Sequence, residues 1–173
     1  MRLGELDTAG ANFARTHWHP PWLERAVATY SRTGEHAACW FAIGALGAVL
    51  DRERRASWLR GAGVVAVAYV ANYAVKIAVR RPRPEYPGLP SLTPVVSSLS
   101  FPSAHATTSF AAARAYGGLV PRGALYVAAG AFALSRPYLG VHYPGDVVAG
   151  AVLGTAIAQA ASYLVPAPTP LRP

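Results

Sequence analysis

The sequence is poor in charge and in cysteine, and each shortage excludes a class of protein. Only 14% of its 173 residues are charged, against about 25% in a typical soluble domain, while 53% are hydrophobic. This composition argues against a disordered chain and against a highly charged soluble domain. The single cysteine, Cys39, excludes an intramolecular disulfide. The mean hydropathy is positive, at +0.24, so we expect a compact integral membrane protein of one domain.

Acidic residues are also scarce, and the basic residues are too sparse for a nucleic-acid-binding surface. The chain has 16 basic residues, all arginine except Lys76, against 8 acidic ones, for a net charge of +8. A nucleic-acid-binding protein would cluster such charges along one face, so we expect no nucleic-acid partner. The arginines instead fit charges that flank membrane spans or bind an anion. The first ten residues contain Glu5 and Asp7 and no apolar run, which does not fit a secretory signal peptide.

Five apolar stretches approach the length of about 20 residues that a helix needs to cross a bilayer. They are residues 36–50, 61–79, 104–120, 123–139 and 147–165. The sequence therefore predicts an all-α integral membrane bundle of about five spanning helices, formed by residues 34–165 of a single domain, 1–173. A proline-rich segment, 80–103, separates the second span from the third. Long loops of this kind are usually functional or disordered, and we interpret residues 85–103 as a lid over a site.

The N-terminal segment, residues 1–33, is too polar to span a membrane but contains an amphipathic helical pattern. Its apolar face consists of Trp22, Leu23, Ala26, Val27 and Tyr30. Its polar face consists of Glu24, Arg25 and Arg32. This pattern predicts a helix that lies in the membrane interface. A helix that packs against other parts of the protein gives the same pattern.

Polar and charged residues gather at one end of the predicted spans. In chain order they are Lys76, Arg83, Ser103, His105, Arg136, His142 and Asp146. Successive spans alternate in direction, so all of these residues lie on one side of the membrane. A charge inside a span costs about 3 kcal/mol at the bilayer centre, which makes it a functional hypothesis by default. Three cations, two histidines and one carboxylate in one layer predict a site for a phosphate group.

Each of these residues has a simpler interpretation when it is taken alone. Lys76 fits a lysine that reaches the membrane interface, and Ser103 or Asp146 fits a helix N-cap. Arg80 and Arg81 fit a topology signal, which is the interpretation we favour for that pair. The joint placement on one side, rather than any single residue, supports a site.

Three motifs carried by these residues resemble those of the type-2 phosphatidic acid phosphatase superfamily. Residues 76–84 (KIAVRRPRP) match the pattern K-x6-RP, and residues 135–146 (SRPYLGVHYPGD) match SR-x5-H-x3-D. Residues 102–105 (PSAH) match PSGH except for Ala104, which stands where glycine is usual. The motifs occur in order, and with the helix layout the resemblance extends over about residues 34–165.

The resemblance implies a phosphatase that forms a phosphohistidine and requires no metal or other cofactor. In this family pattern His142 would attack phosphorus, Asp146 would orient His142, and His105 would protonate the leaving alkoxide. The phosphate-binding residues that the resemblance implies are Lys76, Arg83, Ser103, Ala104 (through its N–H) and Arg136. The three cations among them would neutralise the phosphate oxygens, as Mg²⁺ does in kinases.

The resemblance also implies a lipid phosphate substrate that enters from the surrounding bilayer. The size and the five-span plan are similar to the branch that acts on a polyprenyl-linked phosphoribose phosphate in actinobacterial cell-wall synthesis. Phosphatases of undecaprenyl diphosphate, phosphatidylglycerophosphate and phosphatidate are alternatives. A non-catalytic membrane lipid-binding protein is the alternative from another class.

The orientation in the membrane follows from the arginines. The segment DRERR, residues 51–55, lies opposite the site and favours that side as cytoplasmic by the positive-inside rule. The sequence therefore predicts a bacterial plasma membrane protein with its site on the extracytoplasmic face. Glu35 and His36 lie on the site side and are candidates for contact with the substrate headgroup or, equally, for a cap pair at the start of the first span. Gly150 and Gly154 permit close helix packing, within or between subunits.

Overall fold

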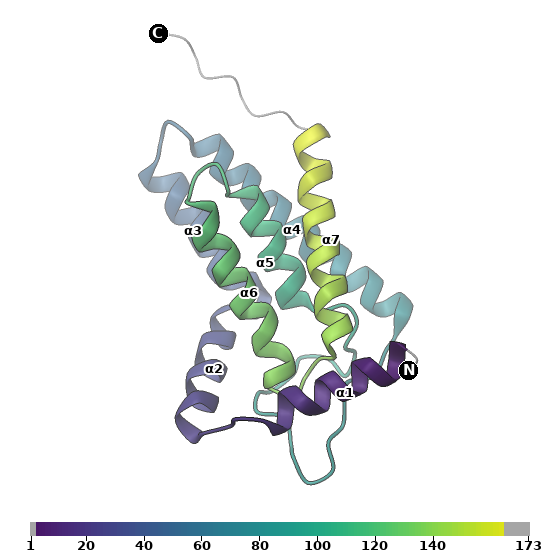
Figure 1. The fold of residues 1–173 in the computed structure, drawn as a ribbon. Helices are drawn as coiled ribbons and strands as arrows, with labels where there is room; N and C mark the ends of the chain where they lie inside the picture. Colours follow the sequence, from purple (N-terminus) through teal and green to yellow (C-terminus); the bar gives the residue numbers. More distant parts are fainter. Residues whose placement is uncertain (1–2, 165–173) are drawn as a thin grey trace.

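The computed structural model describes residues 3–164, which form seven α-helices and one short 3-10 helix (Figure 1). The α-helices are α1 (Leu3–Thr16), α2 (Pro21–Thr33), α3 (Ala38–Leu50), α4 (Arg55–Val79), α5 (Ala104–Ala115), α6 (Arg122–Tyr138) and α7 (Pro144–Leu164). The 3-10 helix η1 (Glu35–Ala37) joins α2 to α3. The predicted all-α class is confirmed for the part of the chain that the structure describes.

Helices α3 to α7 correspond to the five predicted spans, but their ends differ. The third is shorter than expected, because α5 ends at Ala115 and two glycines, Gly117 and Gly118, follow its C-cap. The fifth begins earlier, at Pro144, since proline is tolerated in the first turn of a helix. Among the described helices, only α4 and α7 are long and apolar enough to cross a membrane. Residue 165, the predicted end of the fifth span, lies outside the described residues.

The short helix α5 occupies the centre of the bundle, where α4, α6 and α7 pack around it (Figure 1). Two glycines of α7 allow that helix to approach α5 closely. A Cβ atom at Gly150 would lie 2.6 Å from the Ser103 carbonyl oxygen, and one at Gly154 would overlap the Thr107 carbonyl oxygen. The close packing that these glycines permit therefore lies within one chain, between α5 and α7.

The outer faces of the two longest apolar helices are largely uncovered. The most apolar 18-residue windows of α4 and α7 are only 28% and 22% buried, whereas the core helix of a soluble protein would be mostly buried. Exposed apolar side chains on these faces include Val67, Val70, Ile77, Val148 and Val152. An uncovered apolar face of this kind fits contact with lipid rather than with water.

The N-terminal helices cover the end of the bundle where α6 ends and α7 begins (Figure 1). Helix α1 has no counterpart among the predicted elements. Helix α2 packs on α6, where Tyr30 stacks on Phe132 with ring centres 4.3 Å apart and donates a hydrogen bond to the Ala128 carbonyl. One end of the amphipathic face thus packs against protein, as the alternative interpretation expected, while Trp22 remains exposed.

Residues 80–103 cross the same end of the bundle without forming a helix. Pro82 and Leu99 form an isolated antiparallel bridge within this segment. The Leu92 N–H donates to the Leu139 carbonyl at 3.0 Å, and Arg15 of α1 donates to the Pro90 carbonyl at 2.9 Å. The segment therefore covers the bundle end at which the predicted site residues lie.

Candidate active site

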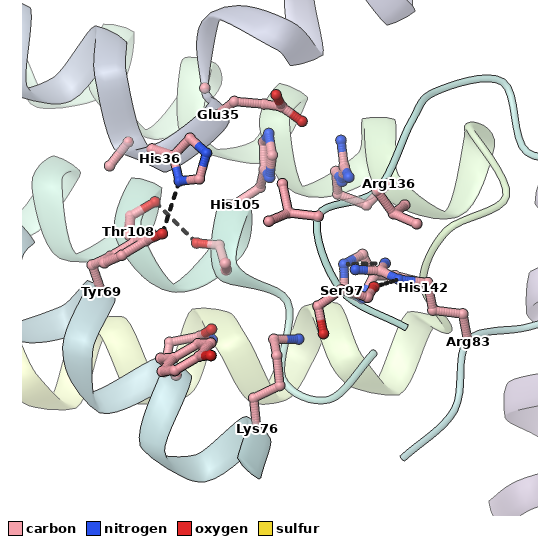
Figure 2. Close-up of a pocket in the computed structure, with 17 residues that line it drawn as sticks. Glu35, His36, Tyr69, Lys76, Arg83, Ser97, His105, Thr108, Arg136 and His142 are labelled. Carbon is pink, nitrogen blue, oxygen red and sulfur yellow. Dashed lines mark hydrogen bonds between the residues drawn. The ribbon is translucent and has the colours of Figure 1, made fainter. Parts of the chain in front are cut away.

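A cavity lies at the end of the bundle that α1 and residues 80–103 cover (Figure 2). Its empty space, including the open mouth, measures about 740 Å³. The predicted site residues that line it are Lys76, Arg83, Ala104, His105, Arg136 and His142. The remaining two, Ser103 and Asp146, are buried behind this layer. The structure thus brings the eight predicted residues together at one end of the fold.

His142 lies in the turn before α7 and is neutral. Arg83 Nη1 is 3.2 Å from His142 Nε2, and since a guanidinium group can only donate, Nε2 is the acceptor. The ring proton is therefore on Nδ1, which lies 3.4 Å from Asp146 Oδ2. Burial, followed by the positive charges of Arg83 and Arg136, holds the pKa of His142 well below its usual range.

The His142 and Asp146 side chains form a close pair without a well-shaped hydrogen bond. Among the described residues, Nδ1 of His142 has no partner that meets hydrogen-bond geometry, although Asp146 Oδ2 is near. The two residues do not share a helical turn, because His142 precedes the helix that contains Asp146. A catalytic hydrogen bond is often long before substrate binds and tightens afterwards.

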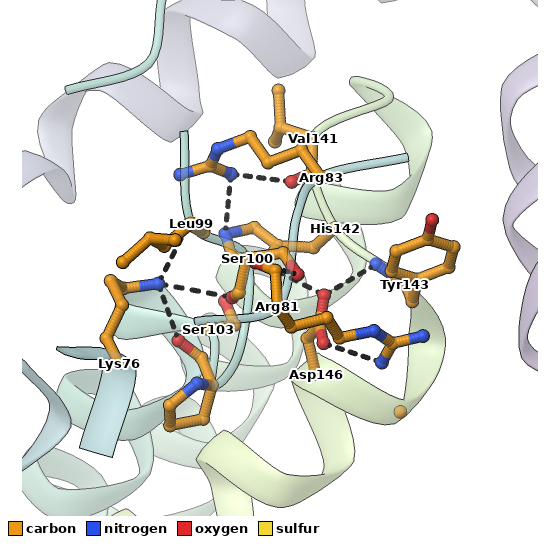
Figure 3. A network of polar contacts seen from close by, with 12 residues as sticks. Lys76, Arg81, Arg83, Leu99, Ser100, Ser103, Val141, His142, Tyr143 and Asp146 are labelled. Carbon is orange, nitrogen blue, oxygen red and sulfur yellow. Dashed lines mark hydrogen bonds and ion pairs between the residues drawn. The ribbon is translucent and has the colours of Figure 1, made fainter. Parts of the chain in front are cut away.

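Asp146 is completely buried and bonded through both oxygens (Figure 3). Its Oδ2 accepts the Tyr143 N–H at 2.9 Å, a bond from the third residue of α7 back to the residue before the helix. Its Oδ1 accepts Arg81 Nη1, also at 2.9 Å. The carboxylate therefore closes the first turn of α7 and is also the partner of His142. Asp146 is not the N-cap that the simpler interpretation expected, because it is the third residue of the helix. Arg81 corrects one interpretation: its guanidinium does not serve only as a topology signal but joins the site network.

The three cations are anchored to the protein in different ways. Arg83 donates to the Ser97 carbonyl at 2.7 Å and to the Val141 carbonyl at 2.6 Å. Burial lowers the pKa of Arg83, and the Asp146 carboxylate opposes that shift. Arg136 Nη1 donates to the Ser31 hydroxyl at 2.6 Å.

Lys76 uses all three of its ammonium protons on backbone carbonyls (Figure 3). The acceptors, at 3.1 to 3.2 Å, are the carbonyl oxygens of Leu99, Ser100 and Pro102. Lys76 lines the cavity, and its ammonium group holds the segment that leads into α5. It contributes positive charge to the site, and a direct bond to a ligand would replace one of these contacts.

Two further donors beside His142 are buried and make no hydrogen bond within residues 3–164, the Ser103 hydroxyl and Nε of Arg136. Ser103 is the N-cap residue of α5, yet its side chain makes no cap bond. The N–H groups in the first turn of α5, beginning with Ala104, point away from the helix toward any anion at its N-terminus. Both side-chain donors and this helix end suit a ligand with several acceptor oxygens.

His105 is held by a residue that the sequence did not mark. Its Nε2 lies 3.0 Å from the Ser31 carbonyl oxygen, and because a carbonyl only accepts, Nε2 carries a proton. Ser31 is fully buried near the end of α2 and also binds Arg136 through its hydroxyl. One residue of the N-terminal segment therefore orients a histidine and an arginine of the cavity. No motif or spacing in the sequence identifies Ser31.

The outer part of the cavity is lined by η1 and α4 (Figure 2). Glu35 and His36 are both among its lining residues, as expected for headgroup contacts. His36 Nδ1 is 2.8 Å from the Tyr69 hydroxyl. His36 and Ala37 have left-handed backbone angles, with φ of 51° and 59°, a strained conformation for residues with a Cβ atom. This turn places Glu35 and His36 at the cavity wall.

Two further observations concern other possible sites. Arg114 donates to Gln159 of α7 at 2.6 and 3.0 Å and does not line the cavity. In the part of the chain that the structure describes, no three His, Cys, Asp or Glu side chains converge as a metal site would require.

Comparison with known proteins identifies relatives. The profile of the PAP2 superfamily matches residues 57–170. Decaprenylphosphoryl-5-phosphoribose phosphatase of Mycobacterium tuberculosis is 40% identical over 127 residues, which cover 73% of this chain and 72% of that protein. The protein of the same name from Mycolicibacterium smegmatis is 48% identical over 123 residues, 69% of this chain and 67% of that protein.

Two solved structures share the fold. The transmembrane PAP2-type phosphatidylglycerolphosphate phosphatase from Bacillus subtilis superposes with a TM-score of 0.75 at 24% identity, over 94% of this chain and 85% of that chain. LpxE of Aquifex aeolicus superposes with a TM-score of 0.73 at 20% identity, over 91% and 95% respectively. At these identities the likeness concerns the arrangement of helices.

Proposed function

The chain belongs to the PAP2 superfamily, and from this we propose that it is an integral membrane phosphatase of decaprenylphosphoryl-5-phosphoribose phosphate. It removes the phosphomonoester group through a phosphohistidine intermediate. The observation that carries the proposal is the convergence of two histidines and three cations on one cavity at the end of the bundle. The names of the two mycobacterial relatives supply the substrate.

The nucleophile is Nε2 of His142. It is unprotonated because it accepts from Arg83, so its lone pair is available once the incoming phosphate draws the guanidinium to its own oxygens. The bond from Nε2 to phosphorus forms as the bond to the leaving oxygen breaks. Asp146 stabilises the positive charge that the ring then carries, since its Oδ2 lies beside Nδ1.

His105 is the general acid for the leaving group. Its Nε2–H is held by the Ser31 carbonyl, which leaves Nδ1 to carry the transferred proton. With the phosphate bound, His105 is protonated on both ring nitrogens, and it gives the Nδ1 proton to the leaving alkoxide when the phosphohistidine forms. In the second step it takes a proton from a water molecule that attacks phosphorus, and the bond to His142 breaks to release inorganic phosphate.

Charge and hydrogen-bond donors around the phosphate perform the remaining catalysis. Arg83 and Arg136 neutralise non-bridging oxygens, Lys76 adds a third positive charge, and the Ser103 hydroxyl and the Ala104 N–H donate hydrogen bonds. Fixed donors of this kind stabilise the transition state without reorganisation. In this mechanism three side-chain cations supply the charge that a divalent metal supplies in other phosphoryl-transfer enzymes.

The outer cavity favours a sugar phosphate over a diphosphate. Its polar lining includes the Glu35 carboxylate and the His36–Tyr69 pair. A carboxylate accepts hydrogen bonds from sugar hydroxyls and repels a second phosphate group directly attached to the first. In the proposed substrate a ribose separates the two phosphoryl groups, whereas in undecaprenyl diphosphate they are adjacent.

The proposed membrane arrangement uses the whole chain, 1–173, as one domain. Helices α3 to α7 span the bilayer, and the short helix α5 does so surrounded by α4, α6 and α7. Residues 1–33 lie in the interface, with Trp18 and Trp22 exposed. The site faces the extracytoplasmic side of the plasma membrane. At the site end the charge of Arg81 is paired with carboxylates, and Arg15 is buried. These two arginines therefore count less as topology signals than the arginines of residues 51–55, which favour that side as cytoplasmic.

The test is phosphate release by the purified protein in detergent. Decaprenylphosphoryl-5-phosphoribose phosphate, undecaprenyl diphosphate, phosphatidylglycerophosphate and phosphatidate are compared at equal mole fraction. We expect the first to have the highest kcat/KM, with no turnover by His142→Ala and normal turnover by His17→Ala, a matched variant of an exposed histidine that does not line the cavity. A ranking led by another lipid would overturn the substrate. An inactive wild type would favour a lipid-binding protein instead.

A further inference from the structure

Arg81 lies between two carboxylates from opposite ends of the sequence. Its Nη1 is 2.9 Å from Asp146 Oδ1, and its Nη2 is 2.6 Å from Asp7 Oδ2. Its guanidinium carbon also lies 3.9 Å from the centre of the Tyr143 ring. Arg81 follows α4, Asp7 belongs to α1, and Asp146 belongs to α7. The three side chains therefore join three separate parts of the fold beside His142 (Figure 3 shows Arg81, Asp146 and Tyr143).

The second oxygen of Asp7 reaches the helix that contains Asp146. Oδ1 of Asp7 accepts the Gly145 N–H at 2.6 Å. A Cβ atom at Gly145 would lie 2.9 Å from Asp7 Oδ2, so glycine at that position permits the approach. Asp7 thus contacts both the guanidinium that binds Asp146 and the backbone of the residue next to it.

The charges of this cluster contribute to the electrostatic potential on the Nδ1 side of His142, because Asp146 Oδ2 lies 3.4 Å from Nδ1. Asp146 and Arg81 alone would form a neutral pair, which has little capacity to stabilise a positive charge on His142. With Asp7 included, two carboxylates share one guanidinium and the cluster carries one net negative charge. When His142 becomes a phosphohistidine with a protonated Nδ1, that negative charge lies behind it in a buried setting, where charges interact strongly.

We propose that Asp7 is a positioning residue that preserves the negative charge of Asp146 toward His142 by sharing the Arg81 guanidinium. This inference rests on the proposed function, in which His142 is the nucleophile. Asp7 lies outside residues 57–170, which the family profile matches. The N-terminal helix α1 therefore completes the site, in addition to covering it.

The experiment compares three variants with the wild type on p-nitrophenyl phosphate and on the preferred lipid phosphate. Asp7→Asn keeps the size and one acceptor oxygen but removes the charge. We expect it to lower kcat by about 10- to 100-fold, the usual effect of losing a partner that supports a catalytic group, with little change in KM. Asp51→Asn is the matched control. Asp51 pairs with Arg54 at 2.7 Å and accepts the Trp58 Nε1–H at 3.0 Å. None of these residues lines the cavity, so we expect normal activity.

The double variant Asp7→Asn/Arg81→Gln separates an electrostatic role from a structural one. In Asp7→Asn the Arg81 guanidinium neutralises Asp146 alone. Removing it restores one net negative charge on the cluster, so the double variant should be more active than Asp7→Asn. A residue that merely braces α1 predicts the opposite, since the second substitution removes further contacts. Normal activity of Asp7→Asn, or a double variant no better than Asp7→Asn, would overturn the proposal.

Vanadate binding, measured by calorimetry, tests the proposed role of Asp7 without turnover. Vanadate occupies the phosphoryl position in line with His142, so Asp7→Asn should bind it more weakly than the wild type, and the double variant should recover affinity. Equal affinities in all variants would contradict the inference. If the three proteins show this order of vanadate affinities but the wild type releases no phosphate from any lipid, the proposed function is refuted and the role of Asp7 remains supported.

Discussion

Replacing Ser31 by alanine should reduce catalysis through Arg136 and leave His105 in place. The substitution removes the hydroxyl that accepts Arg136 Nη1 at 2.6 Å, but the carbonyl that holds His105 belongs to the backbone and remains. A hydrogen bond to a charged group contributes about 1.5–3 kcal/mol, equivalent to about 10- to 150-fold in rate. Bound phosphate gives Arg136 another acceptor, so we expect a loss in kcat/KM near the lower end, about tenfold.

The assay measures kcat/KM on p-nitrophenyl phosphate and on a lipid phosphate with an alkoxide leaving group. Because His105 is undisturbed, Ser31→Ala should lose the same factor on both, whereas His105→Ala should lose least on p-nitrophenyl phosphate. Thr33→Ala serves as the control, since Thr33 is exposed on the same helix and bonds only the Tyr30 carbonyl. The reasoning is refuted if Ser31→Ala matches the control, or if its deficit depends on the leaving group.

Three further predictions address the cofactor, pH and orientation. Activity should persist in excess EDTA and fall with vanadate; loss on chelation that Mg²⁺ restores would contradict the cation-only mechanism. The folded pKa of His142 is below its unfolded value of about 6.5, so its contribution to stability is present above that pH and is lost as pH falls toward the folded value. The Tm of the wild type should therefore drop on acidification more than that of His142→Ala, and parallel curves would argue against a buried neutral imidazole. In a Cys39→Ala background, an impermeant thiol reagent applied to cells should label Ser91→Cys but not Ser57→Cys, and the reverse would place the site in the cytoplasm.

The sequence predicted the five apolar helices, though not all of their ends, and the layer of site residues, because both depend on local patterns. Lys76, His105 and His142 lie at the ends of apolar runs, and the alternation of antiparallel helices is enough to bring them to one side. Their family motifs then indicated chemistry. The length of α5 was overestimated, since its apolar residues continue to Val120 although Gly117 and Gly118 interrupt the helix.

The supporting residues could not be predicted in the same way. Ser31 meets Arg136 across 105 positions, and Asp7 meets Gly145 across 138. No periodic pattern links residues so distant in the sequence, and an aspartate or serine in a polar helix is ordinarily a surface residue. Arg81 was assigned to topology because a basic residue after a span fits that role by position. Its ion pairs depend on the positions of α1 and α7 beside the segment that follows α4.

The most direct test of the account is the chemical identity of the phosphorylated enzyme. Purified protein is mixed with substrate labelled in the cleaved phosphate, quenched in alkali, which preserves phosphohistidine, and mapped by mass spectrometry. We predict label on His142 of the wild type, no label in His142→Ala, and normal labelling in the His17→Ala control. Label on another residue, or full turnover by His142→Ala, would contradict the assignment of His142 as the nucleophile.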